Sequence, residues 1–230
     1  MKIVFTPDWF TGTDVLIETF SFIILFLFFT LCLKSYRMTK NRNTFYLGLG
    51  FFAIALAEIF TIFTKFVLYY DTTFTQQIGN MMITKQILTS VDIFYYIGFF
   101  LHKFFTLMGF YIIYKIPSKK GITEDFLLVL TFLIISAIFG NILYYVFHIV
   151  TLLLLILIIK NYNEVYKKNK SKNTKILIIS FSILALSQMI MIISTMGSVY
   201  VTAQIVQVVS YIILLVLMVR ITQHGKKKKP

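Results

Sequence analysis

The sequence predicts an all-α membrane protein, a polytopic bundle of seven transmembrane helices with an external N-terminus and a cytoplasmic C-terminus. Three observations favour this fold. First, 58% of the 230 residues are hydrophobic, compared with about 45–50% in soluble domains. Second, these residues gather in long runs, which are typical of bilayer spans. Third, 18 of the 22 Lys and Arg residues lie in the gaps and tail that this topology places inside, as the positive-inside rule requires.

The first part of the chain contains three apolar runs long enough to cross a hydrocarbon core of about 30 Å. These predicted spans are Val15–Leu33, Thr44–Tyr70 and Ile87–Tyr114. We expect residues 1–14 to form an external segment and the polar stretch Asp71–Gln86 to form an external loop. A cleaved signal peptide is not expected, because acidic residues flank the start of the first run and no small-residue cleavage site follows it.

Two later uncharged runs are each too long for one span. Residues 126–159 would form a helix of about 51 Å and residues 176–219 one of about 66 Å. Gly140-Asn141 and Met196-Gly197-Ser198 contain turn-forming residues, so each run is expected to divide there. Fusing the first run into one span would move eleven basic residues outside, against the positive-inside rule. The predicted spans are therefore Thr123–Phe139, Ile142–Ile159, 176–196 and 199–219, which complete a membrane domain over 15–220 before a basic tail, 221–230.

Five ionisable residues interrupt the second and third spans: Glu58, Lys65, Asp92, His102 and Lys103. Such groups are costly at membrane depth and usually face a partner or a wet cavity. Counting the rise along antiparallel helices places Glu58 level with His102 and Lys103, about 20 Å above the inner end, and Lys65 near Asp92, about 30–35 Å above it. We therefore expect two pairs of oppositely charged residues, one at each level, and call each pair a rung. The alternatives are purely structural pairing or, for Lys65, snorkelling to the interface.

Polar residues of other spans are expected in the same outer half. Tyr200, Gln204, Gln207 and Tyr211 follow an i, i+4, i+7, i+11 pattern, which places them on one face of the last span. Gln188 lies at mid-depth in the sixth span. A lone Gln more often joins two helices than binds a ligand, but four polar residues on one face favour a pocket. Asp14, Glu18 and His148 add further outer groups. The predicted ligand-binding residues are Glu58, His102, Lys103, Gln188, Gln204, Gln207, Asp92 and Lys65.

The sequence contains no motif of the common catalytic, nucleotide-binding or metal-binding types, and Cys32 is its single cysteine. We therefore expect no enzymatic activity, cofactor or metal. The formal net charge of +13 does not favour a nucleic-acid partner, because the basic residues lie in short gaps between spans. They are expected to contact anionic lipid headgroups at the inner face of the cell membrane. A cytoplasmic or membrane protein is a further possible partner.

Three functional classes fit these patterns. The first is a sensory or small-ligand-binding module with an outward-facing polar pocket. The second is a transporter for a small solute or ion, and the third is an accessory or scaffold subunit of a membrane complex. The inner half offers few polar side chains, so the pocket is expected to close below Glu58. All three prolines lie outside the spans, which disfavours the broken helices common in transporters.

Overall fold

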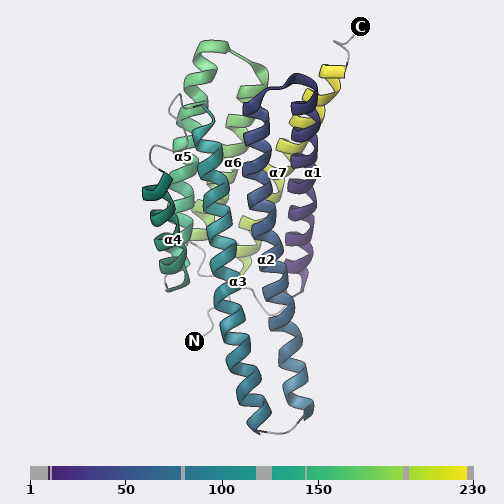
Figure 1. The fold of residues 1–230 in the computed structure, drawn as a ribbon, viewed down its shortest axis with the longest axis vertical. Coiled ribbons are helices and arrows are strands. Elements are labelled where there is room, and N and C mark those ends of the chain that lie inside the picture. The colour runs from purple at the N-terminus through teal and green to yellow at the C-terminus, as the bar shows by residue number, and fades with distance from the viewer. Residues whose placement is uncertain are drawn as a thin grey trace.

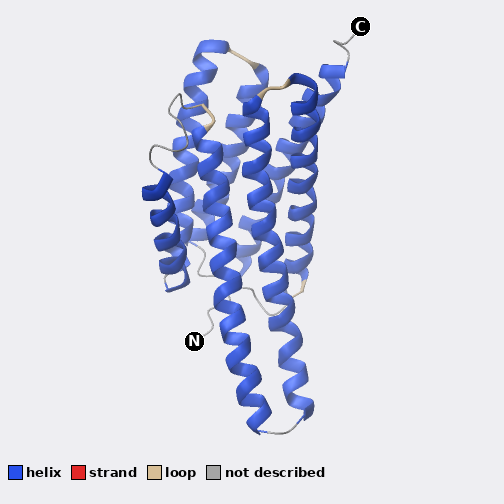
Figure 2. Cartoon of the chain, viewed as in Figure 1, coloured by secondary structure: helices blue, strands red, loops and turns tan. Residues whose placement is uncertain are grey.

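The computed structural model describes the backbone of residue 10 and of residues 12–78, 81–117, 126–142, 144–193 and 197–226. Within these ranges it describes all side chains except those of residues 68–78, 81–93, 126–130, 140–142, 144, 197 and 224–226. This part of the chain is helical throughout apart from short connections (Figure 2). Its helices are α1 (Thr13–Thr39), α2 (Arg42–Ile78), α3 (Met81–Lys115), α4 (Phe126–Ile142), α5 (Tyr144–Asn169), α6 (Lys172–Ile193) and α7 (Gly197–Lys226).

Six of the seven described helices are long and apolar enough to cross a membrane. The exception is α4, whose 17 residues extend about 26 Å. In Figure 1, α4 lies beside α3 and α5 over the half of the bundle from which α5 begins. The all-helical, multi-pass membrane architecture expected from hydropathy is thus confirmed.

The described helices end and begin within a few residues of the two predicted divisions of the long apolar runs. The described helix α4 ends at Ile142 and α5 begins at Tyr144, whereas α6 ends at Ile193 and α7 begins at Gly197. The external loop expected over Asp71–Gln86 is wrong, because α2 continues to Ile78 and α3 begins at Met81. Hydropathy marks only the part of a helix that contacts lipid, whereas backbone hydrogen bonds can extend the helix into water. The α2–α3 hairpin accordingly projects beyond the other helices (Figure 1).

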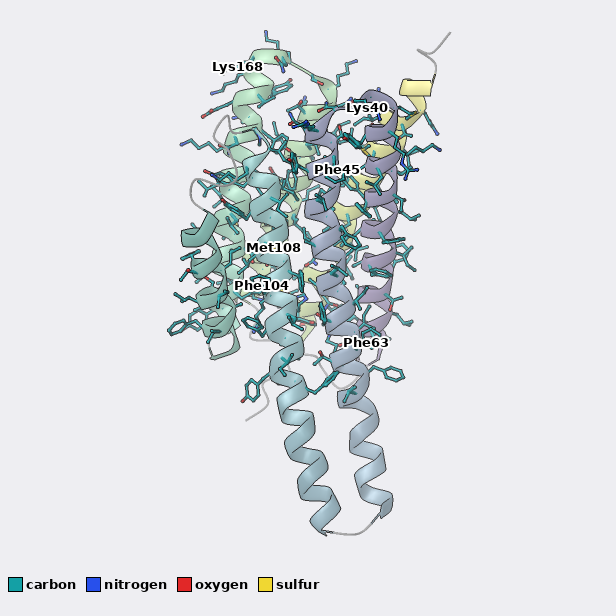
Figure 3. The ribbon with its side chains drawn as sticks, viewed as in Figure 1. Lys40, Phe45, Phe63, Phe104, Met108 and Lys168 are labelled. Carbon is teal, nitrogen blue, oxygen red and sulfur yellow. The ribbon has the colours of Figure 1, made fainter. Side chains whose placement is uncertain are left out.

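The two ends of the bundle differ in charge. Lys40 and Lys168 lie together at one end, and Phe63 lies toward the other (Figure 3). We call the first the basic end and the second, from which the α2–α3 hairpin projects, the hairpin end. The helices alternate in direction, so α1 starts at the hairpin end and α7 finishes at the basic end (Figure 1).

Six helices form a closed ring. The contacts run from α1 to α2, α2 to α3, α3 to α5, α5 to α6, α6 to α7, and back from α7 to α1. The remaining described helix, α4, packs outside this ring against α3 and α5 (Figure 1). Each ring helix therefore turns one face toward a shared interior, and that interior is where the buried polar side chains must find partners.

Glycines allow α2 and α3 to approach closely. A Cβ atom added to Gly109 would lie 2.5 Å from the Gly50 carbonyl oxygen, and one added to Gly98 would collide with the Thr64 hydroxyl. Small residues at a helix–helix contact let the two backbones approach in this way. The resulting antiparallel register places His102 beside the α2 turn that contains Glu58, so the predicted level of these two residues is confirmed.

Apolar side chains fill the interior of the ring toward the basic end. Aromatic rings dominate this region: the Phe28 and Phe51 centroids are 4.4 Å apart, and Phe51 stacks on Phe181 at 6.3 Å. The apolar plug, as we call it, takes one fully buried residue from each ring helix. Its members are Phe28, Phe51, Ile113, Leu155, Phe181 and Leu214.

Candidate functional site

A buried lysine between two acids lies near the hairpin end. The Lys65 Nζ atom is 2.6 Å from Asp14 Oδ2 and 2.5 Å from Glu18 Oε1. The three side chains are 6%, 0% and 8% exposed, respectively. Asp14 and Glu18 are one turn apart on α1, so both face Lys65 on the neighbouring helix α2. We call these three residues the acid–lysine cluster.

Asp14 also fixes the start of α1. Its Oδ1 atom accepts hydrogen bonds of 3.0 Å from the backbone N–H groups of Gly12 and Val15. A carboxylate at this position also favours the helix dipole. Asp14 is therefore part of the bundle, although the sequence analysis assigned it to an external segment.

Two α7 residues extend the acid–lysine cluster. The Tyr200 hydroxyl interacts with the Lys65 ammonium group and accepts a hydrogen bond of 2.6 Å from Gln204 Nε2. Two acceptor atoms remain: Glu18 Oε2 and Gln204 Oε1 are buried and have no hydrogen-bond partner among the described residues. Buried acceptors normally find a donor in the protein, in ordered water or in a ligand. The network thus has two acceptors that no described donor reaches.

Two histidines lie on the other side of the ring interior. His102 Nδ1 is 2.6 Å from Thr61 Oγ1 and 3.1 Å from the Ala57 carbonyl oxygen. His148 Nδ1 on α5 is 2.8 Å from Gln188 Oε1 on α6. A proton on Nδ1 would be donated to the Ala57 carbonyl by His102 and to Gln188 Oε1 by His148, whereas the Thr61 hydroxyl can either donate to His102 Nδ1 or accept from it.

The predicted rung between Glu58 and His102 is not formed as a direct contact. Glu58 is buried and level with His102, but the described hydrogen bonds of the His102 ring go to Thr61 and Ala57. These two residues share one stripe of α2, and Glu58 is turned about 100° away from Ala57. The Glu58 carboxylate instead interacts with the charges of Glu18 and Lys65.

The second predicted rung, between Lys65 and Asp92, stays a prediction, and the described partners of Lys65 are those of the acid–lysine cluster. Lys65 points from α2 toward α1 and bonds to Asp14 and Glu18. Lys65 is also only 5% exposed, so the snorkelling alternative is wrong. The Asp92 side chain lies outside the described residues.

The three glutamines predicted to bind a ligand lie on two helices, α6 and α7. Gln188 pairs with His148 across α5 and α6. Gln204 and Gln207 each bond a tyrosine on their own helix, since Gln207 Nε2 donates to the Tyr211 hydroxyl at 3.0 Å. The polar stripe predicted for the last span is therefore present on α7. Lys103 is also buried, close enough to His102 and His148 for their charges to interact.

The buried ionisable groups are arranged by charge. Among the side chains that the structure describes, the acids are on α1 and α2, whereas the bases are on α3 and α5, apart from Lys65, which two acids hold. The acids are Asp14, Glu18 and Glu58, and the bases opposite them are His102, Lys103 and His148. Of these six residues, His102 is partly exposed and the other five are buried. This dipolar interior suits a ligand that carries both donor and acceptor groups better than a lipid chain.

The sequence analysis missed the acid–lysine cluster, although its members are visible in the chain. Asp14 and Glu18 are four residues apart, so they share a face and need a common counter-charge. Lys65 offers that charge at the corresponding outer level. The sequence did not show that α1 packs on the face of α2 that carries Lys65.

No group of three or more His, Cys, Asp or Glu side chains in the described part of the chain could hold a metal ion. Comparisons of the chain with protein-family models, with curated proteins and with solved structures found no match. Its function therefore has to be argued from the interior of the ring.

Proposed function

We propose that all seven helices cross the cell membrane, with the hairpin end outside and the basic end in the cytoplasm. The bias of Lys and Arg toward one end supports this orientation. The bias of basic residues supports a seventh crossing as well, because a chain that crosses only six times would place eleven of them outside. A reporter fused after Lys172 or at the C-terminus is expected to read cytoplasmic, and one inserted within 71–86 external. An external reading after Lys172 would contradict the seven-span topology.

We further propose that the protein is a sensory or ligand-binding module that receives a small polar or zwitterionic compound from outside. The observation that carries this proposal is the layering of the ring interior, with polar groups toward the hairpin end and the apolar plug toward the basic end. The ligand-binding residues remain Glu58, Lys65, Asp92, His102, Lys103, Gln188, Gln204 and Gln207, and the acid–lysine cluster adds Asp14 and Glu18.

The apolar plug favours binding over transport. A transported polar solute would have to pass between Phe51 and Phe181, whose rings stack at 6.3 Å, and lose its hydrogen bonds there. A bound ligand needs no such path. It would change the packing of the ring helices, and a partner at the basic end would detect that change. Transport remains the alternative function, and a scaffold subunit is the second alternative.

Thermal stability with added compounds tests this function. A ligand that binds only the folded protein raises the melting temperature Tm, so purified protein is heated with a panel of free amino acids, betaines and small sugars. A positive compound is expected to lose its effect in Glu58→Gln and Lys103→Met, but not in the control Glu164→Gln, which changes an exposed acid near the basic end. The proposal fails if no compound stabilises the wild type. Uptake of a stabilising compound into proteoliposomes would favour the transporter.

We also propose that the basic end contacts anionic headgroups and a cytoplasmic or membrane protein partner. Its exposed basic residues include Lys167, Lys168, Lys170 and Lys172. Each basic side chain near an anionic surface contributes about 1 kcal/mol. Replacing these four residues by Gln is expected to reduce co-purified anionic lipid. Unchanged lipid content would contradict the headgroup assignment.

A further inference from the structure

We infer that the ligand of the proposed site carries a primary ammonium group, which donates hydrogen bonds to Glu18 Oε2 and Gln204 Oε1. This inference rests on the proposed binding function and names the chemical class of its ligand. It begins with the two buried acceptors that no described donor reaches. Both belong to one network, because Glu18 bonds Lys65, Lys65 interacts with Tyr200, and Tyr200 accepts from Gln204.

None of the donors already present in this network, the Tyr200 O–H included, reaches either of these two acceptors. Lys65 has three N–H bonds, and these serve Asp14, Glu18 Oε1 and Tyr200. Gln204 Nε2 donates to Tyr200 at 2.6 Å. An incoming group must therefore supply donors of its own, which excludes a carboxylate, a phosphate or any other group that only accepts.

The formal charge of the network also favours a cation. Three carboxyl groups lie around Lys65: Asp14 and Glu18 pair with it, and Glu58 lies within electrostatic range of both Glu18 and Lys65. An uncompensated charge at membrane depth is costly. An ammonium group would add a positive charge beside these carboxyl groups together with the donors that the two acceptors need. The described residues contain no group of His, Cys, Asp and Glu suited to a metal ion.

The network also lies near the hairpin end, which we propose faces the outside of the cell. Glu18 is five residues beyond the first residue of α1, about 8 Å along its axis, and Tyr200 is three residues beyond the first residue of α7, about 5 Å. A ligand that enters from the hairpin end would reach both without passing the apolar plug. The bases on α3 and α5 lie on the opposite side of the ring interior, where they would receive the anionic end of a zwitterion.

Methylammonium chloride is the simplest probe of this inference, with tetramethylammonium chloride and sodium chloride at the same ionic strength as controls. Tetramethylammonium has the charge but no N–H donor. For wild-type protein in detergent, methylammonium is expected to raise Tm by about 2–4 °C more than either control salt. The difference is expected to vanish in Glu18→Gln and in Gln204→Leu, and to persist in Glu164→Gln.

Three results would overturn the inference: equal effects of the three salts on the wild type, a larger effect of sodium, or a methylammonium effect that survives in both site variants. The wild-type comparison is decisive even if a variant does not fold. Failure of the inference is separable from failure of the proposed function. A panel compound that stabilises the wild type and Glu18→Gln equally would retain a binding function and reject the ammonium site.

Discussion

Replacing Lys65 by Met tests whether the acid–lysine cluster holds α1 against α2. Met keeps most of the length and volume of the Lys stem while removing its charge. Asp14 Oδ2 and Glu18 Oε1 would then lose their ammonium partner, although they are 2.6 and 2.5 Å from Lys65 Nζ in the wild type. Both carboxylates are at least nine-tenths buried and could not be rehydrated without separating the helices.

The expected loss of stability follows from the cost of breaking a buried ion pair, about 3–5 kcal/mol in soluble proteins. For a chain of 150–250 residues, each 1 kcal/mol changes Tm by about 2–4 °C. Lys65→Met is therefore expected to lower Tm by about 6–20 °C. Combining it with Asp14→Asn and Glu18→Gln is expected to recover most of this loss, because neither α1 side chain then carries a charge without Lys65, and Asn can still accept the hydrogen bonds from the Gly12 and Val15 N–H groups.

Cys32 offers a direct assay. It is the single cysteine of the chain and is fully buried in the apolar core, so a thiol-reactive dye reports unfolding as the temperature rises. Lys160→Met, which changes an exposed residue on α5, is the control and should alter stability by less than about 0.5 kcal/mol. The stabilising role of Lys65 is refuted if Lys65→Met lowers Tm no more than Lys160→Met does. It is also refuted if the triple variant has a lower Tm than Lys65→Met alone.

Three further variants test the packing around the site with the same thiol assay. Thr61→Val removes the hydroxyl that is 2.6 Å from His102 Nδ1, so a loss of about 1–3 kcal/mol is expected, whereas Thr61→Ser should retain wild-type stability. Gly109→Ala places a methyl group 2.5 Å from the Gly50 carbonyl oxygen. It should cost about 1–3 kcal/mol, and an unchanged Tm would show that α2 and α3 separate freely. Phe181→Ala opens a cavity in the apolar plug and should lower stability by about 3–5 kcal/mol, more than Phe181→Leu does.

Hydropathy and turn chemistry were sufficient to predict the order of the helices, although not the extension of α2 and α3 over most of residues 71–86. The division between α4 and α5 lies next to Gly140-Asn141, and the one between α6 and α7 next to Met196-Gly197-Ser198. Axial rise was also sufficient to predict that Glu58 and His102 lie at one level. These predictions succeeded because they depend on local residues and on distance along a single axis, both of which the sequence contains.

The rotation and order of the helices could not be predicted in the same way. Counting residues gives the height of Lys65 but not whether it faces α1 or α3, so its pairing with Asp14 and Glu18 was not predicted. Similarly, uniformly apolar helices give no sign that α4 lies outside the ring while α3 contacts α5 directly. In lipid, an apolar face can point toward another helix or toward the membrane at similar cost.

The arrangement of polar and apolar layers bears on how a ligand could influence the basic end. α7 contributes Tyr200 and Gln204 to the network with Lys65, and the same helix contributes Leu214 to the apolar plug. Closely packed interiors shift between discrete arrangements rather than deforming continuously. A ligand that draws α7 toward α1 would therefore have to repack Leu214 against its neighbours in the plug. That repacking would reach the basic end of α7 without any polar path through the membrane, which is the property expected of a sensor and not of a channel.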